Sequence, residues 1–118
     1  MKGPQTAQIW KFEIPPNALE SLHTGNGREM RFSIRMPLLG SKVMCVQLQN
    51  NCPFIWVAVH PDQPVRPRDF FVRAAGEPLE FKLNSLGRVP VSYVGTFQVK
   101  EFVWHLFTRG EDDGTRQF

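Results

Sequence analysis

The chain has 118 residues, of which 42% are hydrophobic and 21% charged, and this length and composition are typical of one globular domain. Ten prolines and nine glycines break so short a chain into short elements, and ten phenylalanines favour strands over long helices. The net charge of +3 is small and acidic residues interrupt the basic ones, so the extended basic stripe of many nucleic-acid binders is missing.

Targeting and redox signals are absent from the sequence. No apolar run approaches the roughly 18–20 residues of a membrane span, and the first residues carry no apolar signal region, so we expect a cytosolic protein. Cys45 and Cys52 are not spaced as a metal-binding pair, and no histidine pair completes a zinc site. A disulfide between these two cysteines stays open at this point.

The first expected strand covers residues 9–14. Trp10, Phe12 and Ile14 alternate there with polar residues, which is the two-residue period of a half-buried strand. The two prolines that follow end the strand, because proline cannot donate a hydrogen bond to a neighbouring strand. Residues 17–22 are long enough for one helical turn.

The most regular alternation in the chain lies at residues 29–36, where apolar and polar side chains exchange at every step. It predicts a strand with one buried and one exposed face. The expected buried residues are Met30, Phe32, Ile34 and Met36, and the expected exposed residues include Arg31 and Arg35.

A hairpin is expected between residues 42–49 and 54–60, because Asn50 to Pro53 have the composition of a turn. In the first of these strands we expect three inward side chains, Met44, Val46 and Leu48. The second is apolar on both faces, which is typical of a central strand that is covered on both sides.

The remaining sequence reads as a rigid loop from Pro61 to Pro67 followed by four further strands. These are expected at residues 69–74, 79–83, 92–99 and 101–107. About eight short, mainly antiparallel strands indicate an all-β, single-domain sandwich or small barrel. We assign residues 1–108 to this domain and residues 109–118 to a flexible, charged C-terminal tail.

The sequence offers no catalytic constellation. There is no nucleophile elbow, no phosphate-binding glycine loop and no carboxylate pair close in sequence outside the tail, except Asp62 and Asp69. His23, His60 and His105 lie far apart on different elements. We therefore expect no enzyme activity, no cofactor and no metal, and we read the function as binding.

The most suggestive stretch lies between residues 60 and 73, where three arginines and two phenylalanines follow a proline-rich loop. A guanidinium group matches phosphate or carboxylate, an aromatic ring can stack on a base, and a rigid loop loses little entropy on binding. Strand alternation predicts one phenylalanine in the core and the other on the face of Arg73. The candidate ligand-binding residues are Arg66, Arg68, Phe70, Phe71 and Arg73.

An alternative interpretation of the same stretch is purely structural, with the arginines paired to Asp62 and Asp69 and both phenylalanines in the core. A secondary basic surface is expected on the outward face of the second strand. It consists of Arg28, Arg31 and Arg35, and it could equally be a solvated strand face that discourages aggregation.

Several segments, taken together, resemble a known family. They are IWKFEI at residues 9–14, MPLLGSKVMCVQLQ at 36–49, WVAVHP at 56–61, YVGTFQ at 93–98 and VWHLF at 103–107. In this order they resemble a family of short uncharacterised proteins carried by bacteriophages and prophages, over nearly the whole of residues 8–107.

The resemblance implies an accessory binding protein in the cytoplasm of a bacterial host. In this context we expect a protein that counteracts a host antiviral defence by sequestering an anionic, nucleotide-type signal. A protein-binding inhibitor of a defence complex, such as a CRISPR effector, is the alternative, and a small virion or assembly component is a third. Because edge strands associate unless they are blocked, we also expect a homo-oligomer.

Overall fold

The computed structural model describes residues 6–25, 30–77 and 91–109, and shows an almost entirely β architecture, as the sequence predicts. In chain order the elements are β1 (Gln8–Glu13), α1 (Pro16–Thr24), β2 (Met30–Pro37), β3 (Lys42–Gln49), β4 (Cys52–Val59), β5 (Val65–Ala74), β6 (Val91–Val99) and β7 (Phe102–Arg109). The strand expected at 79–83 lies outside the described residues, as do residues 110–118 of the expected tail. Arg109 is the last residue of β7.

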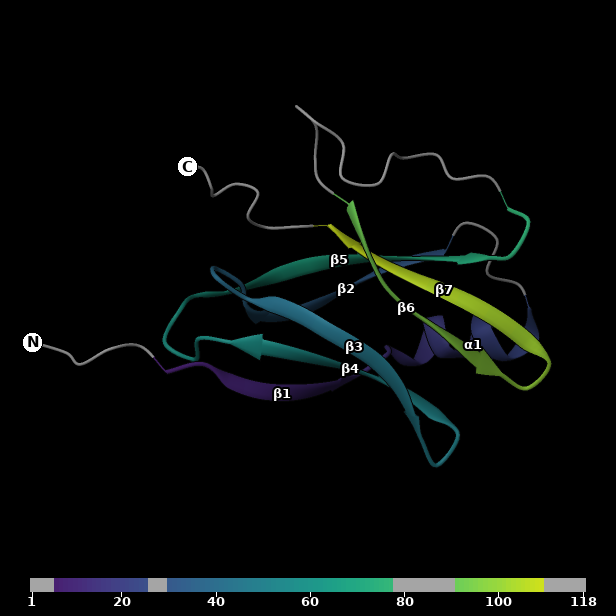
Figure 1. The fold of residues 1–118 in the computed structure, drawn as a ribbon, viewed down its shortest axis with the longest axis horizontal. Coiled ribbons are helices and arrows are strands. Elements are labelled where there is room, and N and C mark those ends of the chain that lie inside the picture. Colours follow the sequence, from purple (N-terminus) through teal and green to yellow (C-terminus); the bar gives the residue numbers. More distant parts are fainter. Residues whose placement is uncertain (1–5, 26–29, 78–90, 110–118) are drawn as a thin grey trace, which may run out of the picture.

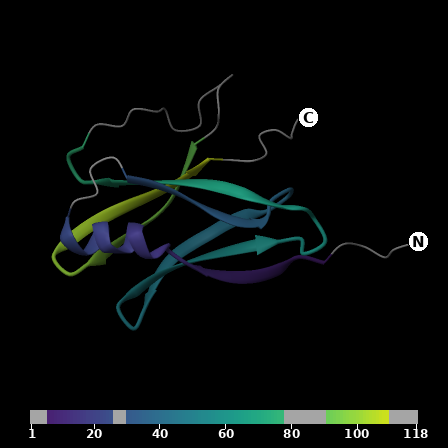
Figure 2. The same ribbon diagram turned by 180° about the vertical axis from the view of Figure 1, so that it is seen from behind.

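The described strands form two antiparallel sheets that face each other (Figure 1). The three-stranded sheet has the order β1-β4-β3, and the four-stranded sheet has the order β2-β5-β7-β6. The helix α1 joins the two sheets near the turn between β6 and β7, which Figure 2 shows from behind, and it contacts β2 and β7. The helix α1 has nine residues. In the described part of the chain, no helix is long and apolar enough to cross a bilayer.

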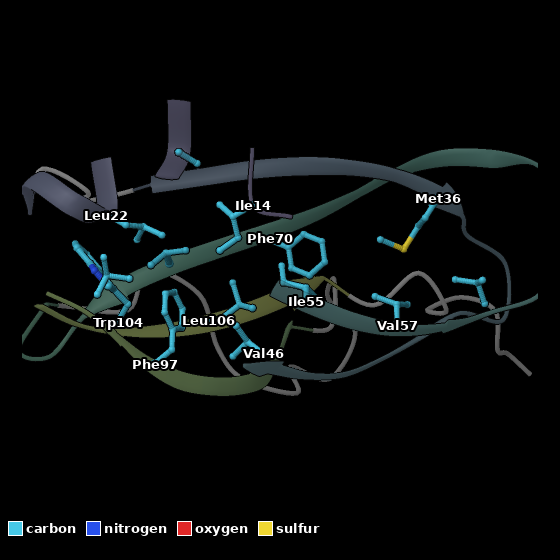
Figure 3. Close-up of a cluster of buried hydrophobic side chains, with 14 residues drawn as sticks. Ile14, Leu22, Met36, Val46, Ile55, Val57, Phe70, Phe97, Trp104 and Leu106 are labelled. Carbon is cyan, nitrogen blue, oxygen red and sulfur yellow. The ribbon is translucent and has the colours of Figure 1, made fainter. Parts of the chain in front are cut away.

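The core lies between the inner faces of the two sheets (Figure 3). Ile55 and Val57 come from the three-stranded sheet, and Phe70 and Leu106 come from the four-stranded sheet; all four are fully buried. The helix closes one end of this core with Leu22, which is also fully buried. Apolar burial from both layers is therefore what joins the sheets.

The helix is longer than the single turn expected at residues 17–22. Pro16 starts it, and proline suits the first helical position because the N–H that it lacks has no partner there. The helix ends at Gly25, whose φ of 77° is left-handed and whose N–H donates to the Ser21 carbonyl.

The alternation predicted for β2 is confirmed. Met36 is fully buried, and Arg31 and Arg35 are exposed. The other inward residues, Met30, Phe32 and Ile34, are half-buried and pack against the core. Half-burial follows from position, because β2 is the outermost of the described strands in its sheet.

The expectation for β3 is wrong at Met44, whose side chain is 49% exposed, and Leu48 is exposed as well. A β-bulge explains the first difference: Val43 pairs with Val57, but Cys45 already pairs with the preceding residue of β4, Trp56. The extra residue moves the inward position from Met44 to Val43, and Val46 points inward as predicted.

The predicted hairpin between β3 and β4 is confirmed, and β4 is the central strand of its sheet. Its turn is shorter than expected: Gln49 pairs with Cys52, so Asn50 and Asn51 alone form the turn, both with positive φ. Within one chain the outward face of β4 is only partly covered, because Phe54 and Trp56 are half-buried.

Both cysteines carry free thiols. The hairpin register pairs Cys45 with Trp56 and Cys52 with Gln49, so the two cysteines are not cross-strand partners. No disulfide therefore joins β3 to β4 in this structure.

The strand β5 begins at Val65, earlier than expected, and it includes the end of the presumed loop. Pro67 pairs with Arg35 of β2, while the pairing of β5 with β7 starts only at Phe70. Position 67 lies outside the paired part of β5 and β7, so no hydrogen bond from its backbone N–H to β7 is needed and proline is tolerated there. Arg66 and Arg68 consequently belong to a strand and not to a loop.

Candidate functional site

The alternation along β5 separates the five predicted ligand-binding residues. Phe70 lies in the core, whereas Phe71 and Arg73 project from the opposite, outer face of the four-stranded sheet. The expected division of the two phenylalanines is therefore confirmed. Phe71 is nevertheless buried as well, so neither ring is an open stacking surface.

Arg68 faces inward and is only 4% exposed. Its guanidinium donates to the Ser41 carbonyl at 3.2 Å and to the Ser41 hydroxyl at 2.8 Å, and also to Thr108 Oγ1 at 3.2 Å and the Arg109 carbonyl at 2.9 Å. These bonds connect the turn before β3 to the end of β7. The contacts of Arg68 are those of an arginine that holds the fold together.

Arg73 lies on the opposite face of the sheet from Arg66 and Arg68. Arg73 is 6% exposed, and its Nη1 donates to the carbonyls of Val72 and Met30 at 2.9 and 3.4 Å. Arg66 is exposed near the start of β5, seven residues before Arg73. Since a strand advances about 3.3 Å per residue, these two arginines are roughly 23 Å apart along the chain. The three arginines therefore do not converge on one ligand.

The structure instead assembles a row of side chains across the outer face of the four-stranded sheet. Arg31 of β2 pairs with Phe71 of β5, Phe71 pairs with Phe107 of β7, and Phe107 pairs with Tyr93 of β6. Tyr93 meets Phe107 edge-on with 5.7 Å between ring centroids. We call this row, together with Arg109, the arginine–aromatic face.

Two guanidinium groups lie over the Phe71 ring. The guanidinium carbons of Arg31 and Arg109 are 5.6 and 5.5 Å from the ring centroid. Arg109 also approaches Asp69, with 3.5 Å between Nη1 and Oδ2, and Asp69 accepts a hydrogen bond from the Ser33 hydroxyl at 2.7 Å. The carboxylate and the ring thus fix the position of Arg109, while Arg31 remains exposed.

A chain of polar groups borders the arginine–aromatic face. The Tyr93 hydroxyl is hydrogen-bonded to Thr96 Oγ1, and Thr96 Oγ1 lies 2.9 Å from His105 Nδ1. Residues two apart in a regular strand share a face, but a bulge in β6 lies between Tyr93 and Gly95. Tyr93 therefore points outward, while Gly95 lies against Val46 of the opposite sheet. This chain places hydroxyl and imidazole groups beside the aromatic rings.

Sequence reasoning identified Arg31, Arg35 and Phe71 but missed Arg109, Tyr93 and Phe107. The alternation in the last two strands contained a signal for Phe107, because it separates this residue from the buried Leu106. The sequence predicts Arg109 in the tail, whereas the structure places it in β7. Arg35 lies on the same outer face and donates to the Val65 carbonyl at 3.4 Å, while Arg28 lies outside the described residues.

Two hollows lie at opposite ends of β3. One is lined by Leu38, Leu39, Gln63, Pro64 and Arg66. The other is lined by His23, Leu48, Asn51, Gln98, Val99 and Lys100. Within the described residues, no three histidine, cysteine, aspartate or glutamate side chains come close enough to hold a metal ion.

Comparison with known proteins places the chain in a family but gives no named relative. No curated protein and no solved structure matches it. A family model described as a domain of unknown function, DUF7352, matches residues 5–117. Because this match covers nearly the whole sequence, the chain belongs to the DUF7352 family.

Proposed function

We propose that the arginine–aromatic face binds an anionic, nucleotide-type ligand. The observation that carries this proposal is the pair of guanidinium groups, from Arg31 and Arg109, over the single ring of Phe71. Arg35 adds a third guanidinium on the same face of the sheet.

The physical argument rests on guanidinium geometry. A cation–π contact favours a guanidinium near the face of a ring, and the group keeps N–H donors for phosphate oxygens. Arg31 and Arg35 are exposed and are therefore accessible to a ligand from solvent. The carboxylate of Asp69 offsets part of the positive charge, but it pairs with Arg109 and not with these two arginines.

The aromatic and polar groups of the same face suit a base. Tyr93 is exposed at the end of the row and offers a ring for stacking. Thr96 and His105 carry hydrogen-bonding groups next to it, which can pair with the edge of a base. Arg68 and Arg73 play no direct part in this proposal, since both are buried.

The biological role follows from the resemblance to short phage proteins. In this role the protein is an accessory binding protein that sequesters a nucleotide-type signal of a host antiviral defence, without catalysis. The competing role is inhibition of a host defence complex by direct protein contact. A ligand titration distinguishes the two.

The test is calorimetric titration of linear and cyclic nucleotides into the wild type and into Arg31→Ala and Arg109→Ala. A charge-assisted hydrogen bond contributes about 1.5–3 kcal/mol, so each variant should bind roughly tenfold or more weakly. Lys42→Ala is the matched control, because Lys42 is an exposed cation on the other sheet. Binding should also weaken as salt is raised.

Two results would overturn the proposal. If both arginine variants bind as tightly as the wild type, the arginine–aromatic face is not the site. If the wild type binds no nucleotide and instead retains a defence protein from host lysate, protein inhibition replaces nucleotide binding.

A further inference from the structure

Figure 1 shows the turn between β2 and β3 at the left end of the sandwich. The residues of this turn help to line a small pocket. The turn after β2 supplies Leu38 and Leu39, and the loop between β4 and β5 supplies Gln63 and Pro64. Arg66, near the start of β5, completes the wall. The cavity volume is about 260 Å³, which is the size of a small molecule or of one large side chain.

Backbone hydrogen bonds hold the two loops that form the pocket. The Leu38 N–H donates to the Pro64 carbonyl at 3.3 Å, and this bond ties one loop to the other. Within each loop, the Gln63 N–H donates to the His60 carbonyl at 3.0 Å, and the Ser41 N–H donates to the Leu38 carbonyl at 2.9 Å. Proline further restricts the backbone at position 64. The pocket is therefore preformed, and a ligand loses little affinity to loop ordering.

Apolar side chains at this end of the molecule are exposed to solvent. Leu39 and Pro64 both line the pocket; Leu39 is 55% exposed, and Pro64 is exposed as well. Exposed apolar side chains that cluster around a hollow are typical of a binding site, because a ligand can remove them from water.

Arg66 supplies the charge of the pocket. Its side chain is exposed, and it pairs through the backbone with Met36, whose own side chain fills the core below. A guanidinium at the rim of an apolar hollow selects a ligand that joins an anionic head to an apolar body. Gln63 adds an amide that can donate to the same head.

We propose that this pocket binds the carboxylate of a short apolar acid, with Arg66 on the carboxylate and the side chains of Leu38 and Leu39 against the apolar body. A planar carboxylate suits the fork of one guanidinium, and a pocket of about 260 Å³ suits a short apolar body. The inference does not depend on nucleotide binding, because its residues are not those of the arginine–aromatic face.

The test is a titration of hexanoate into the full chain, followed through the methyl signals of Leu38 and Leu39 by NMR. We expect these signals to shift in the wild type, and we expect Arg66→Gln to weaken binding about tenfold. Lys100→Gln is the control, because it removes a cation at the other end of β3 and should leave hexanoate affinity unchanged. Amide spectra establish that both variants are folded.

Further arms of the titration identify the ligand source and test the role of charge. Hexanol has the same body without the carboxylate and should bind at least tenfold more weakly. Acetyl-Gly-Leu with a free carboxylate, compared with its amide, tests whether a peptide chain end is preferred over a free acid. Three results would overturn the proposal. They are equal binding of hexanol and hexanoate, an unchanged affinity of Arg66→Gln for hexanoate, and no binding of hexanoate or acetyl-Gly-Leu.

Discussion

Arg31 of β2 and Phe71 of β5 are cross-strand partners, with the guanidinium carbon of Arg31 5.6 Å from the centroid of the Phe71 ring. A double-mutant cycle with Arg31→Ala and Phe71→Leu should give a coupling energy of about 0.5–1 kcal/mol in urea unfolding, as expected for an exposed cation–π pair. The control cycle uses Arg35→Ala with Phe71→Leu and should give no coupling, since Arg35 pairs with Pro67. Equal couplings in the two cycles would contradict a specific contact.

Two arginines on β5, Arg66 and Arg68, should differ sharply in their effect on stability. Arg68→Ala leaves the Ser41 and Thr108 oxygens without their donor in a buried place, so we expect a loss of about 3–5 kcal/mol. Arg66→Ala changes an exposed side chain two residues away and should stay within about 0.5 kcal/mol of the wild type. Denaturant unfolding of both variants measures the difference, and similar stabilities would refute the structural role of Arg68.

Gly25 and Gly76 both have positive φ, at 77° and 90°, but different surroundings. Alanine at either position is strained by about 1–2 kcal/mol. At Gly25 the added carbon would also lie 2.6 Å from the Phe102 ring, whereas at Gly76 no described residue lies within 4 Å. Gly25→Ala should therefore be less stable than Gly76→Ala by about 1 kcal/mol or more in thermal unfolding. Equal stabilities of the two variants would show that Phe102 moves aside at no cost, and a less stable Gly76→Ala would contradict the prediction.

The two cysteines should react with a thiol reagent at different rates in the folded protein. Cys52 is exposed and Cys45 is half-buried, so Cys52 should be modified first. Cys52→Ser should remove the fast phase of modification, and Cys45→Ser should remove the slow phase. If neither cysteine reacts with the reagent until the protein has been reduced, the two cysteines form a disulfide.

Self-association is expected through the edge strand β1. It pairs only with β4 among the described strands, and its Ile9 side chain is 61% exposed. Sedimentation at micromolar concentration should show a dimer, and Ile9→Lys should give a monomer. Glu101→Lys, at an exposed position in the turn between β6 and β7, is the charge control and should leave the dimer intact. A monomeric wild type would end this expectation.

The sequence predicted the strands and turns where short-range patterns decide the structure. The alternation in β2 is enough to assign its faces, because every inward residue there is apolar. In β3 the same reasoning failed at Met44, since a bulge is decided by the fit of Val43 and Val46 to the opposite sheet. The sequence near Met44 does not show how these side chains pack against the opposite sheet.

The candidate site was harder to predict than the fold. Of the five residues predicted in the segment from 66 to 73, only Phe71 belongs to the arginine–aromatic face. The sequence could not show that Arg68 points inward to meet Ser41. Partners so distant in sequence are brought together only by sheet pairing. The same applies to Arg109, which reaches Phe71 from the adjacent strand β7.

The two bulges restrict how copies of this chain could join. One lies in β3 and the other in β6, and these are the edge strands on one side of the sandwich, where Gly95 meets Val46. A bulged edge is a poor template for another strand, whereas the edges formed by β1 and β2 have unbroken registers. Copies that join by strand pairing must therefore use a single side of the molecule. Where both edges of this side pair with those of one second copy about a two-fold axis, neither edge stays free to add a further copy.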